Sequence, residues 1–272
     1  MPIHQSTRDY FSSLKLEFKE IIENLQREVT TSPIHDLRVN LKKQHAFYLM
    51  LQHLVEDFPI ETILKHHNLL FKNSGKIRDI EVNMKTLKKA VNYQVENLEV
   101  EKKSETYKKK FQEQISSNLF VDDYLPFILC TKILSTESIR FELISDYFNE
   151  LIQKINTFIE NKKLHQVRIH LKELYYNYSW LHGSFTKMRY ASKSISYINL
   201  VQHQLGQWHD LDNVFHSTEM MLHLHSKEVN QVWKERNRLM QALENEATTL
   251  LHMIDKIKQS IDSICDKEMS LG

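Results

Sequence analysis

The stretch HDLRVNLKK at residues 35–43 returns, at an offset of 130 positions, as HQVRIHLKE at residues 165–173. Both copies follow the pattern H-x-x-R-[VI]-x-L-K, with arginine and lysine at the same two places. Upstream residues match at the same offset without a gap, as in the pair Phe18 and Phe148. Because apolar spacing and basic residues both recur, the sequence predicts an internal duplication that keeps a cationic helix face as well as a hydrophobic core.

A second pair of matching segments lies downstream of this motif. GKIRD at residues 75–79 corresponds to GQWHD at residues 206–210 after a slip of one residue. The predicted repeats therefore cover about residues 7–117 and 137–265. Since no low-complexity linker separates them, we expect a single domain over residues 1–272.

The composition favours an all-α fold. The chain of 272 residues contains only 4 glycines and 4 prolines, which leaves little room for a turn-rich β architecture. Its apolar residues recur at helical spacing almost throughout. We therefore expect two helical bundles related by a pseudo-twofold axis and packed into one unit, with a basic groove between them.

Turn and capping residues divide the chain into expected helices. Thr30-Thr-Ser-Pro33 ends the first helix and starts the second, and Asn73-Ser-Gly75 separates a short third helix from a long fourth one. The lysine- and glutamate-rich stretch at 100–117 is interpreted as a solvated helix end or hairpin tip. The expected helices cover about residues 7–28, 32–56, 60–72, 76 onward, 122–134, 138–161, 163–182, 192–205, 208 onward and 228–262.

The charge and cysteine content limit the compartment and the partners. A net charge of +1 exerts no global electrostatic pull, so any charged surface must be local. Cys130 and Cys265 lie far apart without metal-ligand spacing, which favours a reducing compartment. No stretch approaches 18 uncharged apolar residues, and the N-terminus lacks an apolar segment of signal-peptide type. We expect a cytoplasmic protein that does not interact with membranes.

The repeated motif places its basic residues along one edge of a helix. At about 100° per residue, His35, Arg38, Lys42 and His45 fall within an arc of about 80° beside the apolar seam. In the second copy, the residues with the same spacing are His165, Arg168 and Lys172. Two such helices facing each other would line a central groove with cations from both sides.

A plainer interpretation of these cations also exists. They could form an ordinary solvated helix face, or pair with carboxylates of the same chain. Asp79 and Asp210, each four residues after a glycine, are the natural partners and would orient the cations. Packing alone, however, does not require histidine, arginine and lysine at the same three places in both repeats.

The scarcity of glycine restricts how a phosphate could be bound. Glycine occurs only at positions 75, 183, 206 and 272, so a glycine-rich phosphate loop is excluded. Phosphate recognition must then use side chains: arginine offers bidentate forks and lysine offers mobile point charges. A row of such side chains suits an extended polyanion better than one small ligand.

These motifs together resemble the CHAD domain, the conserved histidine α-helical domain. The resemblance rests on HDLRVNLKK at 35–43, HQVRIHLK at 165–172, GKIRD at 75–79 and LGQWHD at 205–210, and it extends over about residues 7–262. It implies two pseudo-symmetric helical bundles around a basic cavity that binds inorganic polyphosphate without catalysis. It also implies partners that carry polyphosphate, either a polyphosphate-metabolising enzyme or a polyphosphate granule.

Position by position, the resemblance implies a set of ligand-facing residues. With His45 added from the cationic face, the expected polyphosphate-binding residues are His35, Arg38, Lys42, Lys43, His45, Arg78, His165, Arg168 and Lys172. His45, Glu173 and Tyr175 stand where the family usually has arginine or lysine. The affinity should be reduced accordingly, because polyanion binding depends on the number of phosphates that are neutralised.

Other ligands are disfavoured by spacing. The chain has 15 histidines but no E-x-x-H, and the remaining histidines do not share a helix face, so we expect no metal and no cofactor. Nucleic acid is disfavoured because no aromatic residues alternate with the cations, and Trp180, Trp208 and Trp233 are interpreted as core. We expect no catalytic residues.

Two further hypotheses follow from the motif. His35, His45, His165 and His209 would gain charge as the pH falls from 8 to 6, which would strengthen polyanion binding if their pKa values were unperturbed. The alternative function is a helical protein-interaction scaffold with a weakened polyanion site. That alternative predicts internal salt bridges that neutralise the groove and an exposed apolar patch elsewhere.

Overall fold

The fold is all-helical, as the sequence predicts. The computed structural model describes residues 3–91, 98–116, 124–136, 143–184, 191–217 and 224–269, and within these ranges the regular elements are ten α-helices and no strands. The helices are α1 (Ile3–Arg27), α2 (Thr31–Leu54), α3 (Ile60–Val91), α4 (Leu98–Ser116), α5 (Leu125–Thr136), α6 (Leu143–Glu160), α7 (Leu164–Ser184), α8 (Ala191–His216), α10 (Ser226–Asn245) and α11 (Ala247–Met269).

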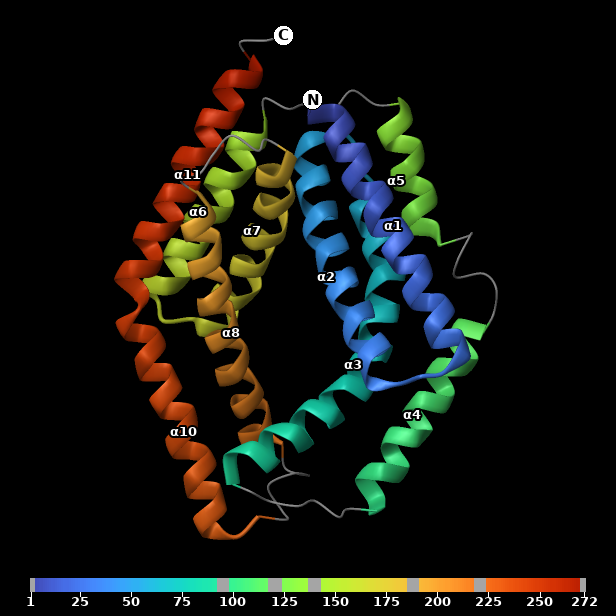
Figure 1. The fold of residues 1–272 in the computed structure, drawn as a ribbon, viewed down its shortest axis with the longest axis vertical. Helices are drawn as coiled ribbons and strands as arrows, with labels where there is room; N and C mark the ends of the chain where they lie inside the picture. The colour runs from blue at the N-terminus through green and yellow to red at the C-terminus, as the bar shows by residue number, and fades with distance from the viewer. Residues whose placement is uncertain are drawn as a thin grey trace.

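The two helices that carry the repeated motif pack against each other. In Figure 1, α1 to α5 lie on one side, α6 to α8, α10 and α11 lie on the other, and α2 and α7 are neighbours near the middle. The second half of α3 crosses toward α8 and α10, and both contacts are present (Figure 1). The motif helices therefore lie inside the molecule, and each contacts elements from both halves of the chain.

The apolar stripes of the sequence form the core. In α1 the side chains of Leu14, Phe18 and Leu25 are at most 1% exposed, as their helical spacing requires. Phe18 stacks on Tyr124 with ring centroids 4.9 Å apart and meets Phe127 edge-on at 5.0 Å. Each such burial contributes about 1.5–3 kcal/mol, so α1 is held mainly by its contacts with other helices.

The two predicted helix breaks at glycine are wrong. α3 runs without interruption through Gly75 and α8 through Gly206, and neither glycine has a positive φ. Glycine within a helix costs about 1 kcal/mol. That cost is smaller than the burial of apolar neighbours such as Leu70 and Ile77, so tertiary packing overrides the local signal.

Two further boundaries differ from expectation. The single helix predicted at 228–262 is two helices, α10 and α11, which meet at Glu246. The stretch predicted as a solvated end is the helix α4, and it buries Val100, Phe111 and Ile115 against its neighbours. Residues 138–142, where another helix was expected to begin, lie outside the described ranges.

Other expectations concern tryptophan, cysteine and membranes. Trp180 and Trp208 are buried as predicted, but Trp233 is 48% exposed, so its assignment to the core is wrong. Cys130 and Cys265 are buried, and no disulfide joins them. Among the helices that the structure describes, none is long and apolar enough to cross a membrane.

Candidate functional site

Four of the predicted cations come together where α2 packs against α7. Arg38 and Lys42 project from α2, and Arg168 and Lys172 project from α7; all four side chains are half-buried. Lys42 is under the electrostatic influence of the other three, and Lys172 is under that of both arginines. We refer to these four residues as the cation cluster.

The cation cluster has no close counter-ion. In the part of the chain that the structure describes, no carboxylate oxygen lies within 4.0 Å of a cluster nitrogen. Asp79 of α3 attracts Arg38 from a greater distance, and Asp210 of α8 likewise attracts Lys42, Arg168 and Lys172. The two predicted orienting carboxylates are therefore near the cations but are not paired with them directly.

Burial and mutual repulsion change the acidity of the cluster. Desolvation, followed by repulsion from Lys172 and the arginines, lowers the pKa of Lys42 to about 6. Desolvation and Arg168 lower the pKa of Lys172 to about 8. Burial also lowers the pKa of Arg38 and Arg168, but a guanidinium stays charged in proteins. The lysines are therefore the groups that can relieve the repulsion by losing a proton.

Arg38 is held firmly by α3. Its Nη1 donates a hydrogen bond to the Phe71 carbonyl oxygen at 2.7 Å, and its Cζ lies 4.2 Å from the centroid of the Phe71 ring. Gly75 makes this position possible, because a Cβ there would lie 2.8 Å from Arg38 Nη1. The glycine of the GKIRD motif is explained by this close approach rather than by a turn.

Arg168 lacks the support that holds Arg38. Its Nε is buried and has no hydrogen-bond partner among the residues that the structure describes. A Cβ at Gly206, which corresponds to Gly75, would meet no atom of the described residues within 4 Å. An unsatisfied buried donor costs about 1–3 kcal/mol, and more when it is charged. Arg168 is thus the arginine that gains most from an anionic ligand.

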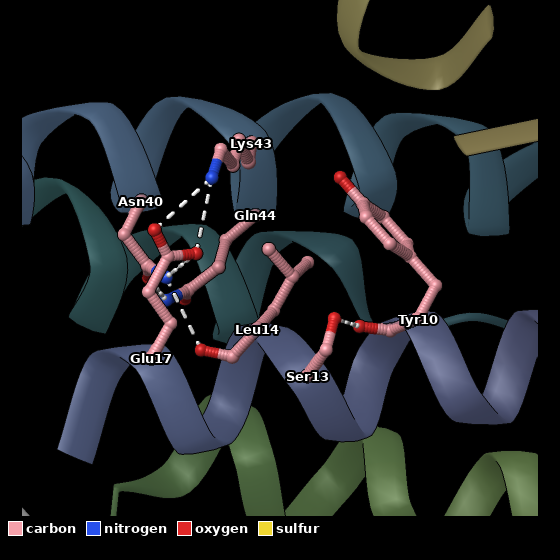
Figure 2. Close-up of polar contacts among 7 residues, drawn as sticks. All are labelled: Tyr10, Ser13, Leu14, Glu17, Asn40, Lys43 and Gln44. Carbon is pink, nitrogen blue, oxygen red and sulfur yellow. Dashed lines mark hydrogen bonds and ion pairs between the residues drawn. The ribbon is translucent and has the colours of Figure 1, made fainter. Parts of the chain in front are cut away.

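Lys43 points away from the cation cluster. Figure 2 shows its Nζ reaching Glu17 of α1, with distances of 3.0 and 3.1 Å to the two carboxylate oxygens. Asn40 donates to the same carboxylate at 3.0 Å. At the matching places in the second repeat, Tyr147 donates to Glu173 at 2.9 Å. The repeat in the sequence does not reveal this second polar pair, because its residue types differ between the two copies.

Three other predicted residues, His35, Arg78 and His165, have neighbours of their own. His35 is exposed and under the electrostatic influence of Lys42 and Arg78, and Arg78 lies 3.7 Å from Glu81. His165 is exposed and stacks on His209, with ring centroids 5.2 Å apart and planes at 21°. Two of these residues, His35 and His165, are therefore open to solvent, while Arg78 lies beside a carboxylate.

His45 lies further along α2, and its neighbours are not residues of the cation cluster. Its ring centroid is 5.6 Å from that of His67, and Glu173 is its charged neighbour. Burial lowers the pKa of His45, and burial with nearby cations or His209 lowers the pKa of His35 and His165. These histidines therefore gain charge at a lower pH than the sequence-based hypothesis assumed.

Comparison with other proteins does not identify the chain. Neither the models of known protein families nor the curated proteins give a match to this sequence. Among the described residues, no group of three or more His, Cys, Asp or Glu side chains is arranged to hold a metal ion. The resemblance to the CHAD family therefore stays a prediction that rests on the motifs.

Proposed function

We propose that the protein binds inorganic polyphosphate, without catalysis, at the cation cluster in a groove between two pseudo-twofold-related helical bundles. One observation carries the proposal: four half-buried basic side chains from two helices have no carboxylate within 4.0 Å among the described residues. Like charges brought together away from water are unfavourable unless a counter-ion offsets them. An anionic ligand supplies that counter-ion.

The helix contacts support the duplicated arrangement. Contacts of α1 with α2 and of α2 with α3 correspond to contacts of α6 with α7 and of α7 with α8. In the same way, α4 and α5 both contact α3, and α10 and α11 both contact α8. A duplication would also account for two equivalent sources of cations on either side of one anionic chain.

An extended polyanion suits the cluster better than a single phosphate. The four cluster residues come from two helices, and His35 and His165, which precede them on those helices, add charge only in acid because their pKa values are lowered. A chain that contacts all four cluster residues should show a logarithmic salt slope of about 3, since each neutralised phosphate contributes about 0.7–0.9.

The alternative, a protein-interaction scaffold, receives less support. It predicts salt bridges that neutralise the groove, whereas the cation cluster has none within the described part of the chain. It also predicts an exposed apolar patch. The large apolar side chains that are most exposed lie one each on six helices: Leu16, Leu69, Ile128, Ile169, Leu200 and Trp233.

Substitutions of the adjacent residues Lys42 and Lys43 test the proposal. Binding of long-chain polyphosphate would be measured by fluorescence anisotropy over a salt series for the wild type, Lys42→Met, Arg168→Met and the control Lys43→Met. We expect the two cluster variants to weaken binding by about tenfold each, which corresponds to about 1.4 kcal/mol. Lys43→Met should bind like the wild type, because that lysine faces Glu17.

The result can also contradict the proposal. A folded wild type that fails to bind polyphosphate at low salt would remove the proposed function. Equal losses in Lys42→Met and Lys43→Met would show that binding depends on overall charge and not on the cluster. Circular dichroism and thermal melting of each variant separate a lost contact from a lost fold.

A further inference from the structure

Lys42 is influenced electrostatically by all three other residues of the cation cluster. Charged groups reach it from every helix that supplies the site: Arg38 from α2, Arg168 and Lys172 from α7, Asp79 from α3 and Asp210 from α8. Within the described residues, neither of the other two helices that pack against α2 brings a carboxylate within 4.0 Å of Lys42. On α1, Glu17 is paired with Lys43, and on α6 it is Tyr147 that faces the motif, through its bond to Glu173.

The charges around Lys42 disfavour a fourth positive charge at its Nζ. Three cations oppose it, and neither aspartate lies within 4.0 Å of its Nζ. The side chain is also half-buried, so water screens the repulsion only in part. Of the four cluster residues, the arginines cannot release a proton, whereas a lysine can. Three cations oppose the charge on Lys42 and two oppose that on Lys172, so Lys42 is the lysine at which the repulsion is relieved.

We infer that anion binding at the cation cluster is linked to proton uptake: Lys42 is a neutral amine in the free protein and becomes an ammonium when a phosphate anion binds. The step adds one solvent proton to Nζ and forms no other bond. The lowered pKa values of the two lysines agree with this, since the pKa of Lys42 falls to about 6 while Lys172, with a pKa of about 8, stays mostly charged near neutrality.

Proton uptake makes the affinity depend on pH. For each proton taken up with the ligand, the affinity falls by at most about tenfold per pH unit as the pH rises. The dependence should extend from about pH 6 to pH 9, and it is carried by the lysines. It does not need the histidines, whose pKa values are lowered from the usual range. Protonation of the lysines, and not of the histidines, is therefore the source of the pH sensitivity.

The first part of the test uses the free protein, so it does not depend on the proposed function. Lysines are labelled with trace acetic anhydride between pH 5 and pH 10, and mass spectrometry measures the labelling rate of each lysine. We expect Lys42 to reach half of its maximal rate near pH 6, and to react at neutral pH faster than the exposed Lys65 relative to that maximum. A Lys42 profile that coincides with that of Lys65 overturns the inference.

The second part rests on the proposed function. Calorimetry of long-chain polyphosphate binding at pH 7.5 in Hepes and in Tris gives the number of protons taken up, because the two buffers differ in ionisation enthalpy. We expect close to one proton per site for the wild type and a clear reduction in Lys42→Met. Binding without proton uptake overturns the inference and leaves the function standing. Absence of binding overturns the function, while the labelling profile still decides the state of Lys42.

Discussion

Alanine substitution of the two motif glycines tests how the structure holds its first arginine. Gly75 and Gly206 occupy corresponding places in the repeats, and both lie inside a continuous helix. At Gly75 an added Cβ would lie 2.8 Å from the Nη1 of Arg38, whereas at Gly206 it would meet nothing within 4 Å. The same chemical change should therefore have opposite effects on the free energy of unfolding.

For Gly206→Ala, only the helix preference changes. Alanine is favoured over glycine within a helix by about 0.8–1.0 kcal/mol. Without a steric cost, the free energy of unfolding should rise by about 0.5–1 kcal/mol and the Tm by about 2 °C.

For Gly75→Ala, the same gain is opposed by the displacement of Arg38. Moving the guanidinium breaks its 2.7 Å hydrogen bond to the Phe71 carbonyl and its contact with the Phe71 ring. A hydrogen bond from a charged group contributes about 1.5–3 kcal/mol, and a cation–π contact about 0.5–1 kcal/mol. After the helix gain is subtracted, the variant should be destabilised by about 1–3 kcal/mol.

Urea denaturation followed by circular dichroism would measure both variants, alone and combined with Arg38→Met. In the Arg38→Met background, Gly75→Ala should become as stabilising as Gly206→Ala, which gives a coupling energy of about 2–4 kcal/mol. Equal stabilisation by the two alanines in the presence of Arg38 would refute the conclusion that Gly75 provides space for that side chain.

Three other predictions concern protonation and the buried polar contacts. Between pH 6 and pH 10 the unfolded chain binds more protons at Lys42 than the folded protein does, so wild-type stability should rise with pH by up to about 1.4 kcal/mol per unit. Urea unfolding at pH 6.5 and pH 9.5 should show a smaller rise in Lys42→Met. His67 donates to the Leu41 carbonyl at 2.7 Å, and burial lowers the pKa of His67 to about 4. Stability should therefore fall as the pH drops from 6.5 to 4, again by up to about 1.4 kcal/mol per unit. His67→Gln, which keeps a donor but cannot titrate, should remove this loss in acid-unfolding curves. Asn177 donates to the Ala46 carbonyl at 2.9 Å across the contact of α2 with α7, so Asn177→Leu should cost about 1–3 kcal/mol in urea unfolding. A cost near zero would mean that this bond does not stabilise the helix contact.

Local sequence was sufficient for the class of the fold. Helical spacing of apolar residues, with few glycines and prolines, predicts an all-α protein, and that prediction is confirmed. Local sequence did not predict the helix boundaries correctly at Gly75, Gly206 and Glu246, because those boundaries depend on burial. A glycine interrupts a helix only when no tertiary contact offsets its cost of about 1 kcal/mol.

The site residues, like the fold, were predicted only in part from the sequence. The repeat in the sequence pointed to Arg38, Lys42, Arg168 and Lys172, because arginine and lysine recur there in residue type as well as in position. Lys43 was added to the predicted site by the resemblance to the CHAD family, although the structure pairs it with Glu17. Adjacent residues differ by about 100° around a helix, and which direction meets a counter-ion depends on the helix that packs there.

By itself, the sequence determined that this chain is helical and that two matching helices carry matching cations. Only the tertiary structure decided how those cations behave. It placed α2 against α7, brought Glu17 to Lys43 and left Lys42 without a close carboxylate. The physical reason is that helix formation depends on local spacing and backbone hydrogen bonds, whereas charge and pKa depend on burial and on neighbours that are distant in the chain.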